Sequence, residues 1–235
     1  PPSDPRVAIA RKALEKLVVR KPGRVYVQPC LSPVWDTGLA AHALLETGGE
    51  AADVSARRGL DWLIPCQVLD LAGDWAVQRP GVRPGGWAFQ YANPYYPDLD
   101  DTAMVGLALH RCDPERYRAP IGRAAEWLQG LQSRNDGWAA FDADNTYYYL
   151  NYIPFADHGA LLDPPTEDVS GRCVGFFGQL GGYEDVLKSG IGYLRREQRG
   201  DGAWFGRWGT NYIYGTWSVL VALNTAGIHK ADSMI

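Results

Sequence analysis

The sequence lacks the features of several large protein classes. No stretch approaches the roughly 20 consecutive apolar residues of a transmembrane helix, and no run of Lys and Arg suits a nucleic acid or an anionic membrane. The net charge of −4 also argues against nucleic acid as a partner. Its four cysteines are scattered and show no zinc spacing, which argues against a metal site. They favour a reduced, cytoplasmic compartment, with the thiols as small core residues.

The beginning of the chain carries neither an initiator Met nor a leader of the signal-peptide kind, so we expect it to be part of a longer protein. Apolar residues make up 46% and charged residues 21%, which are the proportions of a globular protein with a buried core. Aromatic residues are in excess, with nine Trp and thirteen Tyr. Each of these side chains can bury about 150–250 Å². They predict a large aromatic core or an aromatic-lined pocket.

An internal repeat organises the chain. Three times, an aromatic–Leu pair is followed by a Gln five residues after the aromatic residue, and then by Gly-Trp or Gly-x-Trp. The units are 65 and 66 residues apart, a period that indicates repeated supersecondary units. Their members are Trp62, Gln67 and Trp87, then Trp127, Gln132 and Trp138, then Tyr193, Gln198 and Trp204. A structural explanation suffices for them, because Gln amides can bond helix ends and Trp rings can pack there.

Each unit predicts two helices. One starts at an Asp and is rich in Ala and Leu, as in 36–46 and 101–110, and the other has apolar residues at helical spacing, as in 124–131. The best strand candidate, 24–28, is short. We therefore predict an all-α fold of helix pairs stacked around an axis. Functional residues are expected in the long loops at one end, 81–97, 142–165 and 205–215.

The run Asp98-Leu99-Asp100-Asp101 opens one of these helices. Asp101 matches Asp36 of the previous unit and is expected to be the N-cap, which leaves Asp98 and Asp100 without a structural task. Three carboxyl groups this close cannot all ionise cheaply, so at least one should have a raised pKa and can serve as a general acid. The alternatives are a solvated helix start and a magnesium site for a diphosphate. A calcium loop would need further oxygen ligands that are missing.

A second pair of charged residues follows one unit later. Asp168 and Arg172 are four residues apart at a predicted helix start, so they share one face and can pair. Taken alone, they predict an ordinary surface ion pair. Their place in the unit next to the acidic run makes both candidates for the same site.

Several motifs together resemble the squalene–hopene cyclase family over almost the whole chain, and the repeats match that family's QW motifs. The matching stretches are 28–37, 85–90, 95–103, 144–146, 153–155, 163–165 and 201–209. The resemblance implies a double α/α barrel, or toroid, in a protein well over twice this length. Residues 1–25 would then be a linker or lead-in helix, and 26–235 an incomplete C-terminal α/α barrel. We expect this chain to be inactive on its own, because half of the cavity wall would be missing.

The resemblance also implies roles for individual residues. Asp100 matches the proton donor, with Asp98 and Asp101 as its carboxylate neighbours, and Asp168 matches the acid that orients the donor's partner. Arg172 stands where some members have His. Arg can bond and polarise Asp100, but it cannot relay a proton because it does not give one up. The substrate would be bound by aromatic residues of the cavity and entry channel: Trp35, Phe89, Phe141, Phe155 and Trp208.

The activity implied is proton-initiated polycyclisation of squalene, or a related polyprenyl, to hopene or hopanol through carbocations. Such cations need a dry cavity and the negative faces of aromatic rings, and neither a metal nor an organic cofactor is required. The family also implies peripheral or monotopic contact with the cytoplasmic side of a bacterial inner membrane, and a homodimer. Two other interpretations stay open from the residues alone. One is an α/α-barrel glycoside hydrolase with Glu167 as second carboxylate, and the other is a non-catalytic helical-repeat binding module.

Overall fold

The computed structural model describes residues 4–28, 31–154 and 162–235. Within these ranges the chain forms eight α-helices and one two-stranded sheet, which confirms the predicted all-α class. None of the described helices is both long and apolar enough to cross a bilayer.

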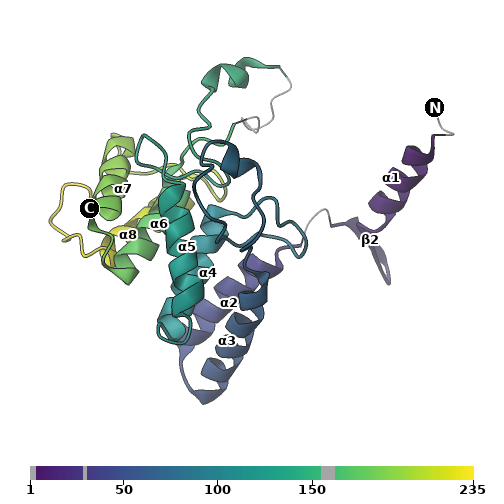
Figure 1. The fold of residues 1–235 in the computed structure, drawn as a ribbon, viewed down its shortest axis with the longest axis horizontal. Coiled ribbons are helices and arrows are strands. Elements are labelled where there is room, and N and C mark those ends of the chain that lie inside the picture. The colour runs from purple at the N-terminus through teal and green to yellow at the C-terminus, as the bar shows by residue number, and fades with distance from the viewer. Residues whose placement is uncertain (1–3, 29–30, 155–161) are drawn as a thin grey trace.

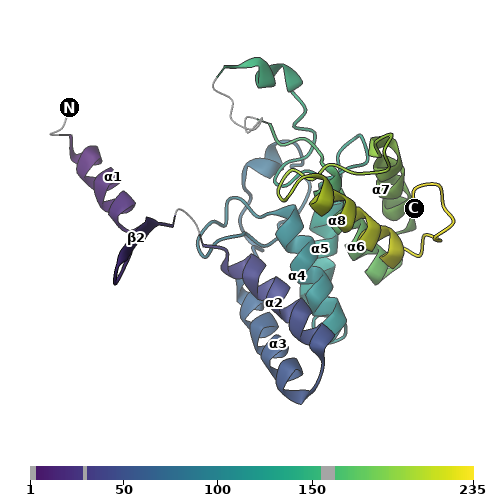
Figure 2. The same ribbon diagram turned by 180° about the vertical axis from the view of Figure 1, so that it is seen from behind.

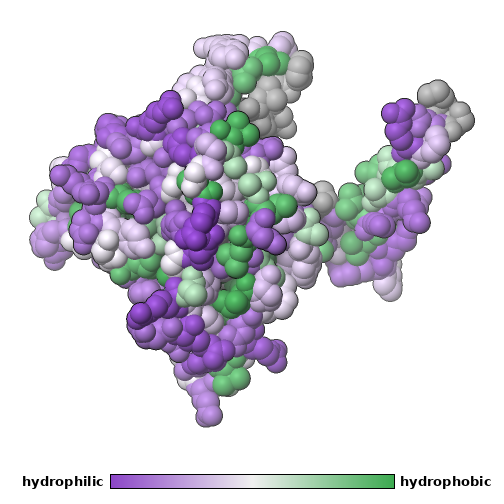
Figure 3. Space-filling view, viewed as in Figure 1, coloured by the Kyte–Doolittle hydropathy of each residue, from purple (hydrophilic) through white to green (hydrophobic). Residues whose placement is uncertain are grey.

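An N-terminal arm stands apart from the body of the molecule (Figures 1 and 2). Its elements are α1 (Pro5–Glu15), β1 (Val18–Lys21) and β2 (Arg24–Val27). The two strands form an antiparallel hairpin, of which only β2 was predicted. The hairpin continues past residue 25, where the sequence suggested a boundary. The arm buries none of its residues in α1 or β2, and Figure 3 shows apolar side chains gathered on it.

Four helices form one row in the body, in the order α2, α4, α6 and α8, each in contact with the next. Their bounds are Pro33–Thr47, Leu99–Cys112, Glu167–Leu180 and Tyr212–Thr225. The first three are each followed by a helix that packs against them: α3 (Glu50–Leu63), α5 (Arg118–Gly130) and α7 (Glu184–Glu197). This alternation confirms the predicted helix pairs. The connecting loops include the short 3-10 helices η1 (Ile64–Cys66), η2 (Asp74–Val77) and η3 (Tyr148–Tyr152).

The inner helices approach closely at glycines. A Cβ at Gly106 of α4 would lie 2.4 Å from Cε2 of Phe176 on α6, so only a glycine lets this ring pack against the α4 backbone. Phe176 and its neighbour Phe177 are fully buried. The aromatic excess thus supplies a large part of the core, which also buries the rings of Trp75, Trp87, Trp127, Trp138 and Trp204.

The repeated Trp and Gln residues hold each unit together. In every unit the Trp indole N–H donates to the carbonyl of the preceding aromatic–Leu pair: Trp87 to Leu63 at 2.7 Å, Trp138 to Leu128 at 2.8 Å and Trp204 to Leu194 at 2.7 Å. Each Gln amide reaches a neighbouring segment: Gln67 to Pro120 O at 3.0 Å, Gln132 to Ser189 Oγ at 2.9 Å and Gln198 to Met234 O at 2.9 Å. The Trp bonds satisfy carbonyls near the ends of α3, α5 and α7, and the Gln bonds join each unit to another segment, which confirms the structural explanation of the repeat.

Candidate active site

The acidic run begins α4, and its first carboxylate is the cap. Oδ1 of Asp98 accepts hydrogen bonds from the backbone N–H of Asp100 at 2.7 Å and of Asp101 at 3.1 Å. The prediction that Asp101 caps the helix was therefore wrong. The Asp98 backbone stays extended because its N–H donates to Trp87 O at 2.8 Å, and the helix starts at the next residue. Likewise α2 starts at Pro33, so Asp36 lies inside its first turn.

All three carboxyl groups of the run are buried, with exposed fractions of 9% for Asp98, 7% for Asp100 and 2% for Asp101. Burial and then the charge of Asp100 raise the pKa of Asp98 to about 8. Burial and then the charges of both neighbours raise the pKa of Asp101 to about 9. Burial also raises the pKa of Asp100, with the positive charge of Arg172 opposing the shift. The predicted crowding of carboxyl groups is confirmed, and it favours the protonated form.

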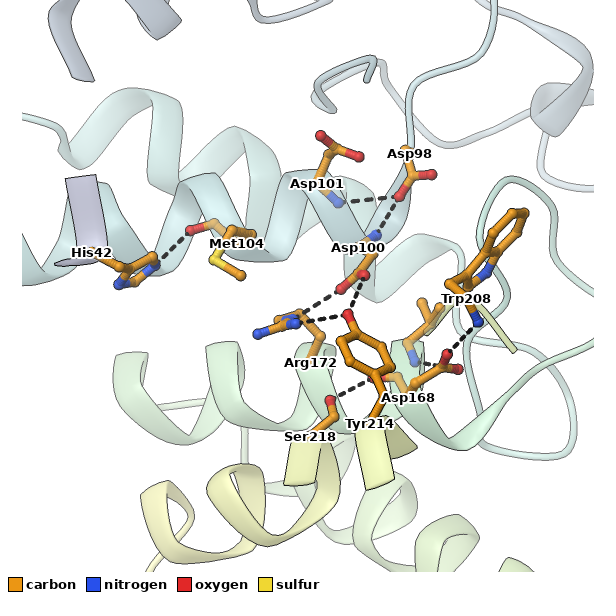
Figure 4. A network of polar contacts seen from close by, with 11 residues as sticks. His42, Asp98, Asp100, Asp101, Met104, Asp168, Arg172, Trp208, Tyr214 and Ser218 are labelled. Carbon is orange, nitrogen blue, oxygen red and sulfur yellow. Dashed lines mark hydrogen bonds and ion pairs between the residues drawn. The ribbon is translucent and has the colours of Figure 1, made fainter. Parts of the chain in front are cut away.

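Arg172 on α6 faces this cluster (Figure 4). Its Nε donates to Oδ1 of Asp100 at 2.9 Å, and its Nη2 donates to the Tyr214 hydroxyl at 3.1 Å. The predicted surface pair with Asp168 was wrong, because Arg172 and Asp168 are both buried and the described ion pair of Arg172 is with Asp100. Oδ2 of Asp168 instead accepts the backbone N–H of Trp208 at 3.1 Å. Burial acts to lower the pKa of Arg172, but Asp100 and Tyr214 outweigh it and the pKa is raised, so the guanidinium stays charged.

Tyr214 is the residue of this network that the sequence analysis missed. Its hydroxyl lies 3.5 Å from Oδ2 of Asp100 as a donor. Burial raises its pKa to about 12, so it remains a neutral phenol. The segment 205–215 was singled out as a functional loop, but Tyr214 lies in the first turn of α8.

Hydrogen bonds that recur in each unit reveal the repeat position of Tyr214. In three units a hydroxyl near the start of the inner helix accepts the backbone N–H of the repeat Trp: Thr102 from Trp87 at 2.8 Å, Ser170 from Trp138 at 2.8 Å and Thr216 from Trp204 at 3.1 Å. These hydroxyls mark equivalent positions. The residues two before them are Asp100, Asp168 and Tyr214. The helices α4, α6 and α8 therefore each place the residue from the same repeat position near one site.

Beside the cluster lies a cavity of about 430 Å³ lined by carboxyl groups and aromatic rings. Its lining residues are Trp35, Phe89, Asp98, Asp100, Asp101, Trp208 and Tyr214. Phe141 meets the Trp208 ring edge-on at 6.3 Å between centroids, so it backs this wall. Phe155 lies outside the described residues. The structure thus brings the three aspartates together with three of the five predicted aromatic residues, and a fourth is one contact away.

The arrangement suits acid chemistry on an apolar molecule. Oδ1 of Asp100 is occupied by Arg172, which leaves Oδ2 to hold an acidic proton. Within the described residues no group of three or more His, Cys, Asp or Glu side chains is arranged to hold a metal ion, so the geometry gives no support to the magnesium alternative. A protonated carboxyl next to a fixed cation and aromatic rings is the pattern of a general acid.

Comparisons with known proteins show the family of the chain. The family model "Squalene-hopene cyclase C-terminal domain" matches residues 31–235. A probable squalene–hopene cyclase of Sinorhizobium fredii is 58% identical over 98% of this chain and 37% of its own length. The squalene–hopene cyclase of Bradyrhizobium diazoefficiens is 57% identical over 98% of this chain and 36% of its own length. The chain therefore spans little more than a third of these relatives.

Among solved structures, the type II terpene cyclase MstE from Scytonema superposes with a TM-score of 0.58 at 18% identity. The match covers 97% of this chain and 60% of that one, and it shows the shared α/α-type fold. The sequence relatives favour the cyclase interpretation over the glycoside hydrolase and the binding module. On the family model and on these identities, the chain belongs to the squalene–hopene cyclase family, and its residues 31–235 match the model of that family's C-terminal domain.

Proposed function

We propose that the chain forms the proton-donating part of a squalene–hopene cyclase, in which Asp100 protonates a terminal double bond of squalene or a related polyprenyl. The observation that carries this proposal is the buried Asp100 carboxyl, bonded to Arg172 and facing an aromatic-lined cavity. The curated relatives named squalene–hopene cyclase support the substrate class. Hopene or hopanol would be the product.

The first step needs an acid that is both protonated and strong. Burial keeps the proton on Asp100, and the Arg172 charge then stabilises the carboxylate that forms when the proton leaves Oδ2. The Tyr214 hydroxyl, as donor to Oδ2, stabilises the same carboxylate. The proton becomes a new C–H bond, and the positive charge passes to the neighbouring carbon of the former double bond.

The cation formed cannot accept hydrogen bonds, so the walls must stabilise it in other ways. The rings of Trp35, Phe89 and Trp208 offer negative faces, each worth about 0.5–2 kcal/mol in such contacts. Oδ1 of Asp101 is buried and, among the described residues, has no hydrogen-bond partner. The partial negative charge of this carboxyl oxygen acts on the cation through a low dielectric.

Asp100 has to regain its proton after each turnover. Arg172 cannot supply it, because a guanidinium holds its protons at any working pH. Asp168, which the family pattern assigns to orienting the donor's partner, lies one turn before Arg172 on α6 and holds the backbone at Trp208. We therefore propose that water reprotonates Asp100.

The wider organisation follows the same family. Residues 26–235 would form part of the C-terminal barrel, with 1–25 as its lead-in. We propose peripheral or monotopic contact with the cytoplasmic side of an inner membrane, where a hydrocarbon substrate dissolves. The exposed tyrosines around η3 support membrane contact, since Tyr favours the membrane interface: Tyr147, Tyr148, Tyr149 and Tyr152. Homodimerisation stays a prediction from the resemblance.

The test is Asp100→Asn in the full-length gene product, with squalene as substrate and hopene and hopanol measured by gas chromatography. Asn keeps the size and the acceptor for Arg172 but cannot donate a proton to an alkene, so product should fall at least about 1,000-fold. The control is Asp70→Asn at an exposed position, which should behave as the unchanged protein. Normal conversion by a folded Asp100→Asn variant would refute the proposal.

A further inference from the structure

The Arg172 guanidinium touches more than its two hydrogen-bond partners. Its central carbon lies 5.6 Å from the centre of the Trp35 ring on α2 and 5.2 Å from the centre of the Trp217 ring on α8. Both distances lie within the range of cation–π contacts, and Arg172 itself is only 9% exposed. Aromatic rings from α2 and α8 therefore contact the Arg172 guanidinium, which itself belongs to α6.

Trp217 is outside the cavity that contains the acid. It lines a second cavity of about 350 Å³ on the far side of Arg172, together with Met104, His42 and Gln179. Tyr214 lies one helical turn earlier on the same face of α8, and the two rings pack with centroids 5.8 Å apart. A single helical face thus supplies a hydrogen bond and a ring to the same guanidinium.

This geometry matters because Arg172 faces open space behind it. Its Nε must point at Oδ1 of Asp100 for the acid to gain from the positive charge. A long side chain bordering a cavity can rotate into it, and two hydrogen bonds at one edge leave that rotation open. A ring that covers the guanidinium prevents this rotation, because Arg commonly stacks on aromatic faces.

We propose that Trp217 is a positioning residue, which together with Trp35 clamps the Arg172 guanidinium so that Nε stays on Asp100. This inference rests on the proposed function and extends it to a residue that touches neither Asp100 nor its cavity. Trp35 then has two tasks, because its ring contacts the Arg172 guanidinium and also lines the cavity beside Asp100.

The charged and titratable groups around Arg172 come from four helices. Asp100 and Asp101 lie on α4, as does Arg111, which lines the second cavity with Arg172. Tyr214 lies on α8, and Asp168 lies one turn earlier on α6. On α2, His42 bonds Met104 O at 3.1 Å, and burial, followed by the charge of Arg172, lowers its pKa, so it is neutral. Arg172 is therefore the cation that acts on Asp100 in this network, and moving it changes the acidity of Asp100 directly.

The test is Trp217→Leu in the full-length gene product, assayed for squalene cyclisation between pH 5 and 9. We expect kcat to fall roughly tenfold with KM changed less than about twofold, because the ring stabilises the acid rather than the substrate. The pH at which kcat declines should also rise, since Asp100 loses part of the charge that lowers its pKa. Trp217→Phe keeps a ring and should restore most of kcat and of the original pH profile. Trp62→Leu, the same change at another half-exposed Trp, is the matched control and should leave both unchanged.

The outcomes separate this inference from the proposed function. If the unchanged protein is active and Asp100→Asn is not, while Trp217→Leu keeps the original pH profile, the clamp is refuted and the proposed function stands. A loss of kcat without a shifted profile also refutes the clamp, because it indicates a purely structural role. Should Trp217→Leu not fold, the Phe variant decides: its profile must shift in the same direction by a smaller amount, and no shift counts against the proposal.

Discussion

Asp100 and Arg172 lie 72 residues apart in sequence, yet Nε of Arg172 is 2.9 Å from Oδ1 of Asp100. The exposed fractions of their side chains are 10% and 9%, so the pair is shielded from solvent. A buried ion pair of this kind contributes little net stability by itself. We propose that its role is to set the acidity of the Asp100 carboxyl group.

Replacing Arg172 by Met should damage both activity and folding. Asp100 would lose the charge that lowers its pKa and become a weaker acid, so kcat should fall at least about 100-fold. At a pH where Asp100 is ionised, removing its buried partner costs about 3–5 kcal/mol of unfolding free energy. Arg172→Lys keeps the charge but loses the fork that also reaches Tyr214, so a loss of about tenfold is expected.

The measurement is kcat by product analysis, and the unfolding free energy by urea denaturation. The double variant Asp100→Asn with Arg172→Met carries no charge at either position, so at a pH where Asp100 is ionised it should be more stable than Arg172→Met alone. Equal activity of the Met variant and the unchanged protein would show that Asp100 does not depend on this cation.

The stability of the protein should depend on pH through Asp98 and Asp101. Their pKa values in the folded protein are about 8 and about 9, while an unfolded Asp has a pKa of about 3.9. Between these values the folded state binds more protons than the unfolded state. Stability is therefore highest at the acid end and falls as pH rises from about 4 to about 9.

Urea denaturation at intervals between pH 5 and 9 measures this slope. The variant with Asp98→Asn and Asp101→Asn cannot release these protons, and Asn retains a cap at the first position. Its unfolding free energy should change less with pH than that of the unchanged protein. A slope that is the same in both proteins would mean that the two carboxyl groups are not the source.

The sequence predicted the helical class, the repeat and the place of the acid, because these depend on local patterns. Helical spacing and the 65-residue period are visible along the chain, and three aspartates in four positions point to a raised pKa wherever they are buried. Positions decided by tertiary contacts were misjudged. Asp98 caps α4 because its backbone pairs with Trp87, a contact that the local pattern does not contain.

Spacing alone missed the partner of Arg172 for a related reason, although the family resemblance implied that Arg172 could bond Asp100. Spacing along one helix suggested Asp168, four residues away, but the packing of α6 against α4 brings Asp100 closer. Tyr214 was hidden because residues at equivalent repeat positions differ completely in chemistry. Only the hydrogen bonds of the neighbouring hydroxyls show that these residues occupy equivalent positions in the repeat. The hydroxyls belong to Thr102, Ser170 and Thr216, and the equivalent residues are Asp100, Asp168 and Tyr214.

Substitutions at Asp168 can separate its two suggested tasks. The family pattern assigns its carboxylate to orienting Arg172, whereas the structure shows Oδ2 holding the backbone N–H of Trp208. Asn keeps an acceptor for this N–H and removes the charge, while Ala removes both. If holding Trp208 is the task, Asp168→Asn should keep kcat within about threefold. Asp168→Ala should lose about 10- to 100-fold, because the cavity wall moves.

The charge has a further, measurable effect. The negative charge of Asp168 raises the pKa of Asp100, so Asp168→Asn should move the decline of kcat to lower pH. Both quantities come from pH profiles of squalene cyclisation by the full-length gene product, with Asp70→Asn as the control. If Asn proves as damaging as Ala, the acceptor for Trp208 is not what matters. The negative charge beside Arg172 must then be the essential feature, and the role implied by the family pattern would hold in place of the one that the hydrogen bonds favour.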